Sequence, residues 1–145
     1  MRESTVLHLN KAYYPHTGGI EAVVQSLAEG LTQRGEFPCR VLACANGIGT
    51  RRSTINGVPV TLAGSLGSVA SLPLSPSFPL WLDRQRADIL HVHLPFPLAD
   101  LSLRALAVLG RLPASTSLVL HWHSDVVRQQ WAMPAYAPLL RWLIR

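Results

Sequence analysis

Short apolar runs alternate with segments of helical periodicity along this chain of 145 residues. The apolar runs have the length and composition of buried β-strands. They cover residues 4–10, 39–45, 58–63, 89–93 and 117–121. Helices are predicted at 20–35, at 76–86, at 97–110 and over most of the stretch after 121. Strands that alternate with helices predict an α/β fold, here a Rossmann-like doubly wound parallel sheet.

The best-defined helix follows the first strand. One stripe of apolar side chains recurs there at helical spacing, and it consists of Ile20, Val23, Val24, Leu27 and Leu31. Glu21 suits the positive amino-terminal end of this helix, and Gly35 suits its stop. Residues 46–57, which include Arg51 and Arg52, are predicted as a turn-rich link, and residues 64–79 as a loop.

The composition is that of one folded domain. Hydrophobic residues make up 48% of the chain and charged residues 14%, which excludes a disordered protein. No apolar run is long enough for a transmembrane helix, and Arg2 and Glu3 precede too short a run for a secretory signal. Cys39 and Cys44 lie on one predicted strand and point to opposite faces, so they cannot form a disulfide. We therefore expect a cytoplasmic protein with reduced thiols.

The net charge of +5 bears on the partners of the protein. All but one of its 13 cationic residues are arginines, the exception being Lys11. Arginine binds phosphate through a planar, permanently charged fork, so anionic lipids and nucleotide sugars are suitable partners. We expect no nucleic acid partner, because the arginines are scattered and do not alternate with aromatic residues on one element.

Three loops of the predicted sheet carry the candidate chemistry. In a doubly wound sheet, ligands bind beyond the carboxyl ends of the strands. Residues 11–19, 93–95 and 121–125 each follow a predicted strand. We expect these three loops to lie along one rim of the sheet.

The Gly18-Gly19 pair stands immediately before the first helix. Free amide groups and the helix dipole at such a position favour an anion, and glycine lets a phosphate approach the backbone. A tight turn without a ligand is the alternative. The surrounding residues 15–20 match neither the G-x-G-x-x-G fingerprint nor a P-loop, which disfavours a nicotinamide enzyme or an NTPase.

Two H-x-H pairs stand at the ends of predicted strands. His91 and His93 share one strand face, and His121 and His123 share a face of the next strand. Zinc is one alternative, with Asp125 or Asp100 as a carboxylate ligand, but no third clear ligand lies nearby in the sequence. We expect His93 and His123, at the rim, to carry chemistry, and the earlier histidine of each pair to be structural.

The residues after His123 leave two readings open. Asp125 either caps the helix that follows, or it orients His123 or binds a polar ligand. Arg128 lies one turn into that predicted helix, where it either binds an anion or is an ordinary surface charge.

Four segments of the chain together resemble the glycosyltransferases of family 4, which have the GT-B fold. The matching segments are P-H-T-G-G at 15–19, the V-x-x-L-A-x-x-L-x-x-x-G helix at 24–35, D-I-L-H-V-H at 88–93 and H-S-D at 123–125. The segments occur in the family's order and with suitable spacing. The resemblance extends over essentially the whole chain.

This resemblance implies that residues 1–145 form the acceptor-side, amino-terminal domain of a retaining hexosyltransferase. The donor-binding, carboxy-terminal domain, with its E-x7-E segment, would be missing, and the 145-residue chain alone would be inactive. A nucleotide sugar would be the donor, a glycan or lipid-linked sugar the acceptor, and no metal or cofactor would be needed.

The resemblance also assigns roles to residues. It implies that Gly18 and Gly19 approach the donor diphosphate and that His123 is catalytic, beside the transferred sugar. His93, Ser124, Asp125 and Arg128 would face the acceptor.

Two alternatives to a transferase stay open from the residues alone. One is a non-catalytic α/β module that binds phosphate or sugar, and the other is a zinc-dependent hydrolase. The apolar segment 135–145 either packs against the sheet and a missing domain or lies on an anionic membrane surface. In the second case the protein would be peripheral on the inner face of the membrane.

Overall fold

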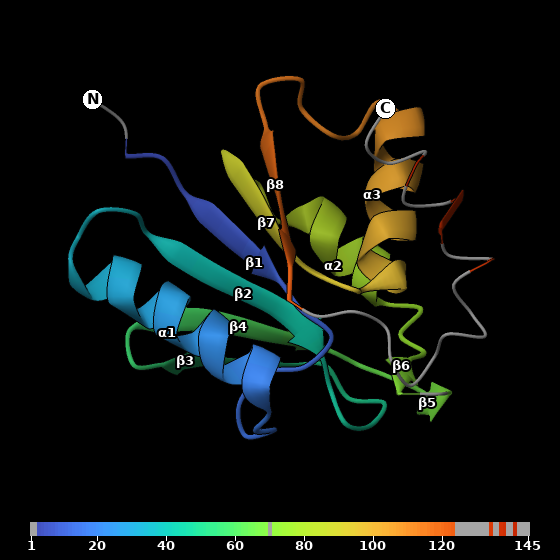
Figure 1. The fold of residues 1–145 in the computed structure, drawn as a ribbon, viewed down its shortest axis with the longest axis horizontal. Coiled ribbons are helices and arrows are strands. Elements are labelled where there is room, and N and C mark those ends of the chain that lie inside the picture. The colour runs from blue at the N-terminus through green and yellow to red at the C-terminus, as the bar shows by residue number, and fades with distance from the viewer. Residues whose placement is uncertain (1–2, 70, 124–133, 135–136, 139–140, 142–145) are drawn as a thin grey trace.

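The computed structural model describes residues 3–69, 71–123, 134, 137–138 and 141. A central sheet has six strands in the order β3-β4-β2-β1-β7-β8 (Figure 1). These strands are β1 (Val6–Leu9), β2 (Cys39–Cys44), β3 (Arg51–Ile55), β4 (Val58–Ala63), β7 (Ile89–Leu94) and β8 (Ser117–Trp122). The neighbouring strands pair in parallel, except that β3 runs antiparallel to β4. A separate hairpin consists of β5 (Ser68–Val69) and β6 (Leu72–Pro73).

Helices cover the two faces of the sheet (Figure 1). They are α1 (Gly19–Gln33), α2 (Phe78–Arg84) and α3 (Pro97–Val108). On one face, Val24 and Ala28 of α1 pack against apolar side chains of β2 and β4. On the other face, α2 and α3 bury a larger apolar cluster that contains Leu90, Val92 and Leu94 of β7. The α/β class and the Rossmann-like layering expected from the sequence are therefore confirmed.

The two cysteines show how strand alternation divides the core. Cys39 belongs to the cluster under α1, whereas Cys44 belongs to the cluster under α2 and α3. Both thiols are buried and free. Burial raises the pKa of the Cys44 thiol to about 12, so it is protonated at neutral pH. The prediction that these residues cannot pair is confirmed.

The sheet is not wholly parallel, because residues 46–57 contain a strand that the sequence did not predict. Arg51–Ile55 forms β3, and Asn56 and Gly57 make the turn into β4 with positive φ angles of 48° and 85°. Asn-Gly is a preferred pair for such a two-residue hairpin turn. The strand lacks an apolar pattern because it lies at the sheet edge, where four of its five side chains are exposed. The predicted loop at 64–79 likewise contains the β5–β6 hairpin.

The predicted helical segment after residue 121 lies largely outside the described residues. Every helix in the described part of the chain is too short or too polar to span a bilayer.

Candidate active site

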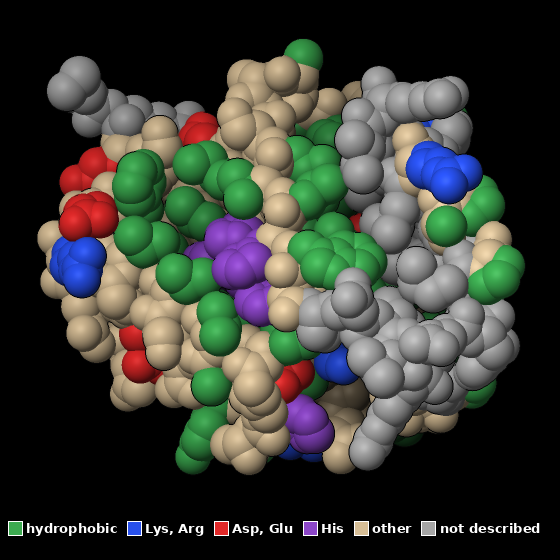
Figure 2. Space-filling model, viewed as in Figure 1, with side chains coloured by type: hydrophobic (Ala, Val, Ile, Leu, Met, Phe, Trp, Pro, Cys, Tyr) green, Lys and Arg blue, Asp and Glu red, His purple; other side chains and the backbone are tan. Residues whose placement is uncertain are grey.

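Five histidines lie side by side on the face of the sheet that carries α1. In the strand register, His8 of β1 stands opposite His91 of β7, and His93 stands opposite His121 of β8. His123 follows β8, two residues after His121, and therefore points to the same face. Figure 2 shows the histidines as a patch near the middle of this face, between hydrophobic side chains. The expected sharing of a face within each H-x-H pair is confirmed.

Strand alternation places these histidines away from the larger core. Leu90, Val92 and Leu94 alternate with the two histidines of β7 and fill the cluster under α2 and α3. The opposite face of β7 then presents His91 and His93. Because α1 packs on β2 and β4, no helix in the described part of the chain covers β7 and β8 on the histidine face.

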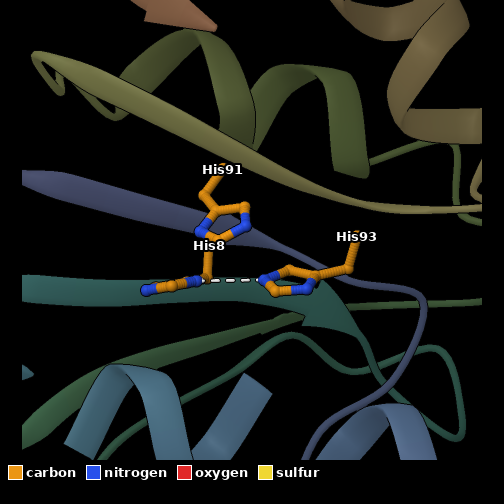
Figure 3. Close-up of side chains that lie close together, drawn as sticks. All are labelled: His8, His91 and His93. Carbon is orange, nitrogen blue, oxygen red and sulfur yellow. Dashed lines mark hydrogen bonds between the residues drawn. The ribbon is translucent and has the colours of Figure 1, made fainter. Parts of the chain in front are cut away.

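Two hydrogen bonds link three of the imidazoles into a chain. The Nδ1 atom of His8 lies 3.0 Å from Nε2 of His93, as Figure 3 shows, and Nδ1 of His93 lies 2.8 Å from Nε2 of His123. The ring planes of each bonded pair differ by only 24° and 25°. Both nitrogens of His93 are therefore engaged, and the three rings form one continuous hydrogen-bonded unit, the imidazole chain.

The interior of this chain is neutral at physiological pH. Both His8 and His93 are fully buried. Burial, reinforced by neighbouring histidines, lowers the pKa of His8 to about 3 and that of His93 to about 2. Burial also lowers the pKa of His91 to about 4. A buried imidazole without a carboxylate partner is more stable uncharged, so each of these rings carries one proton.

His123 is the end of the imidazole chain that reaches the rim. Its backbone N–H donates to the carbonyl of Leu94, at 3.2 Å, which ties the end of β8 to the end of β7. Its side chain is only partly buried, and burial together with His121 lowers its pKa. The carboxylate of Glu21 acts in the opposite direction and raises that pKa. The amino-terminal end of α1 and the end of β8 thus influence the same imidazole.

Glu21 is a residue of the candidate site that the sequence did not predict. The sequence indicated only that its charge suits the positive end of the helix dipole. It is buried, with 6% of its surface exposed, and its Oε1 atom has no hydrogen-bond partner within the described residues. Its Oε2 atom occupies the space that a Cβ atom on Gly18 would need. The glycine therefore makes room for this carboxylate.

The two glycines before α1 have different surroundings. Gly18 is the N-cap residue, in extended conformation and without a side-chain cap. A Cβ atom on Gly19 would meet no heavy atom within 4 Å, so its backbone faces open space. Gly19 begins a helix of 15 residues, whose free N–H groups and dipole favour an anion.

Of the two carboxylates considered for a zinc site, only Asp100 lies among the described residues. Asp100 lies in the first turn of α3, and that helix packs on the opposite face of the sheet, so the interpretation of Asp100 as a ligand was wrong. Asp125 lies outside the described residues, as do Ser124 and Arg128.

His8 supplies the third imidazole that the sequence lacked. One nitrogen from each of His8, His91 and His93 lies within 4.8 Å of the others, and the same holds for His93, His121 and His123. The ligand atoms of a zinc site have lone pairs that converge on the metal. The ring planes of neighbouring histidines instead differ by only 15° to 36°. A metal ion would therefore require rings to turn and the imidazole chain to break.

Comparison with known proteins gives matches over most of the chain. The model of a family described as "Glycosyl transferase 4-like domain" matches residues 18–145. The chain is also 34% identical over 140 residues to O-antigen chain mannosyltransferase C of Escherichia coli. That match covers 92% of this chain and 35% of the relative, so the chain spans about a third of the relative's length. No solved structure gives a significant match.

Proposed function

Because the chain belongs to the glycosyl transferase 4-like family, we propose that it is the acceptor-side domain of a retaining glycosyltransferase. The enzyme would move a hexose from a nucleotide sugar to a glycan or to a lipid-linked sugar. The observation that carries this proposal is the position of His123, a neutral imidazole at the rim beside the open amino-terminal end of α1.

A second domain is part of the proposal. The chain spans about a third of the length of its mannosyltransferase relative, which leaves room for a donor-binding domain elsewhere in the protein. The site described above would then form one wall of a cleft between two domains. The 145-residue chain alone would be inactive, because the group that holds the nucleotide would be absent.

The proposed chemistry uses both ends of the rim. As the bond between the sugar and the diphosphate breaks, negative charge grows on the leaving diphosphate and positive charge on the sugar ring. The backbone of Gly18 and Gly19, at the positive end of α1 and open on the Gly19 side, would stabilise the diphosphate without a metal ion. His123 would hydrogen-bond a hydroxyl of the transferred sugar and hold the ring in position.

The residues proposed to face the acceptor are His93, Ser124, Asp125 and Arg128. The described structure contains only the first of them. Both ring nitrogens of His93 bind other histidines, so a direct contact with the acceptor would replace one of these two bonds. For the other three, the proposal depends on their match to the family pattern.

The cellular setting is likewise a proposal. The net charge of +5 and the apolar segment 135–145 suit a peripheral protein on the anionic inner face of a membrane, where a lipid-linked acceptor would be available. Binding to anionic but not to neutral vesicles, weakened when Arg128, Arg141 and Arg145 are reversed in charge, would support this setting.

Replacement of His123 in the full-length protein tests the proposed function. We expect His123→Ala to lower kcat for sugar transfer by about 100-fold or more, because a transition-state contact is lost. His91→Leu is the matched control, since it removes an imidazole from the same face and leaves both hydrogen bonds of the imidazole chain in place. Near-parental turnover by His123→Ala would refute the catalytic assignment.

A further inference from the structure

We propose that His93 and His8 are positioning residues that hold His123 in a single tautomer, with its proton on Nδ1. The structural part of this proposal concerns the imidazole chain alone. Its consequence for catalysis rests on the proposed function.

The two hydrogen bonds of the imidazole chain couple the three tautomers. A neutral imidazole has one N–H donor and one bare nitrogen acceptor. His93 is bonded through both nitrogens, so it donates to one neighbour and accepts from the other. Only two arrangements satisfy both bonds. Either all three histidines carry the proton on Nδ1, or all three carry it on Nε2.

The buried end of the chain distinguishes these two arrangements. Nε2 of His8 is buried and has no hydrogen-bond partner within the described residues. With the protons on Nδ1, this atom is a bare acceptor. With the protons on Nε2, it would be a buried N–H donor without an acceptor, and orphaned buried N–H groups are the rarer case in proteins.

The exposed end of the chain favours the same arrangement. The Glu21 carboxylate raises the pKa of His123, whereas His8 is affected by burial and by His91. Negative charge therefore acts at the His123 end of the chain. The Nδ1 arrangement moves each of the three protons one nitrogen closer to that end, where the carboxylate stabilises them.

The tautomer decides what His123 can bind. With Nε2 accepting from His93, the remaining Nδ1–H is a donor directed away from the imidazole chain. His123 would then donate to an oxygen lone pair of its ligand, such as that of a sugar hydroxyl. In a similar way, the histidine of a catalytic triad is held in one tautomer by a hydrogen bond with a buried third residue.

Nitrogen NMR on the full-length protein tests the proposal directly. With ¹⁵N introduced only at histidine, protonated and bare ring nitrogens give well-separated signals, and His123→Asn assigns those of His123. We expect the proton on Nδ1 in His8, His93 and His123 at neutral pH. A proton on Nε2 of His123 would overturn the proposal.

Two substitutions of His93 separate positioning from mere packing. His93→Leu removes the donor to His123, and we expect Nε2–H, the form that free histidine prefers in water, to become populated. His93→Asn places an amide N–H near the position of Nδ1, and we expect it to restore the Nδ1–H form. His91→Leu, outside the imidazole chain, should leave the tautomer unchanged. A His123 tautomer that is the same in His93→Leu as in the parent would refute the coupling.

The catalytic consequence has a separate readout. We expect His93→Leu to lower kcat by about tenfold or more, with a smaller loss in His93→Asn. If the NMR result holds and kcat does not change, the tautomer assignment stands and the proposed role of His123 in sugar transfer fails. If the enzyme transfers sugar and His123 carries its proton on Nε2, the proposed function stands and the positioning inference fails.

Discussion

The two faces of β7 bury different kinds of side chain. On one face, Leu90, Val92 and Leu94 are buried under α2 and α3 in an apolar cluster. On the other face, His91 and His93 pack against other imidazoles, and His93 is as deeply buried as the leucines. Alternation of side chains along a single strand thus separates a face that stabilises the fold from a face that places nitrogen atoms at the rim.

The difference teaches that the two faces depend on different conditions. The apolar face gains its free energy from removal of hydrocarbon from water, which is independent of pH. The histidine face is stable only while its imidazoles remain neutral, because no carboxylate in the described structure pairs with His8 or His93 to accept their charge. Acid should therefore destabilise the histidine face, whereas truncation of a buried apolar side chain should destabilise the apolar face.

Acid gives the largest expected effect, and it acts on the histidine face. Above pH 6.5, folded and unfolded chains both hold neutral histidines. Below that, the unfolded chain takes up protons, whereas folded His8 and His93 do so only near pH 3 and 2. The free energy of unfolding should therefore fall by about 1.4 kcal/mol per pH unit for each histidine, or about 3 kcal/mol per pH unit for His8 and His93 together. Hydrogen exchange of the β1 and β7 amides in the full-length protein, corrected for the intrinsic exchange rate, measures this loss of stability.

A variant of His8 is the control for this acid effect. His8→Leu removes one of the protons taken up on unfolding in acid, so the free energy of unfolding of this variant should fall less steeply between pH 6.5 and pH 4. Equal protection of the parental β1 and β7 at pH 7 and pH 5 would contradict the neutral buried state.

Truncation on the apolar face should have the next largest effect. Phe96 is fully buried and meets Phe78 edge to face, with ring centroids 5.2 Å apart. Phe96→Ala should cost about 3–5 kcal/mol of unfolding free energy, through lost burial and the cavity left behind. Exchange rates in β7 and α3 of the full-length protein measure this loss.

The Phe96 effect should be independent of pH, in contrast to the effect at His8. Leu101→Ala in α3, the helix that begins directly after Phe96, is the control, because 54% of Leu101 is exposed and its loss should cost no more than about 0.5 kcal/mol. A cost for Phe96→Ala that grows in acid would break the proposed division between the faces.

The smallest effects should separate Gly18 from Gly19 at the rim. In Gly18→Ala, the new Cβ atom displaces the Glu21 carboxylate, which should cost about 1 kcal/mol of stability. In Gly19→Ala, the methyl group enters open space and stability should change little. We expect Gly19→Ala to raise the KM for the nucleotide sugar by about tenfold, or about 1.4 kcal/mol, because the methyl group obstructs the diphosphate. An unchanged KM would place the diphosphate elsewhere.

The positions of the main strands along the chain could be predicted because their apolar runs are short and well separated. Residues 39–45 and 89–93, for example, coincide closely with β2 and β7. The strand β3 could not be found from hydrophobicity, since its first two residues are arginines and its side chains face solvent. The Asn56-Gly57 turn was the signal available for it, because this pair favours a hairpin.

The two H-x-H pairs are the part of the candidate site that could be predicted from the sequence. The pairing of His91 with His93 follows from their spacing of two. His8 is a single histidine in an apolar strand, and it joins them only through the register between β1 and β7, more than 80 residues apart in the chain. Glu21 required the fold as well, because its proximity to His123 depends on how α1 packs against the sheet.

The polar strand β3 forms one edge of the central sheet. An edge strand offers unpaired N–H and C=O groups that a second chain could extend. Arg51 and Arg52 are exposed on this edge, and the antiparallel β3 interrupts the parallel order of its neighbours. If two copies met through β3, four guanidinium groups would be brought together. Mutual repulsion of these charges would oppose edge-to-edge aggregation through β3.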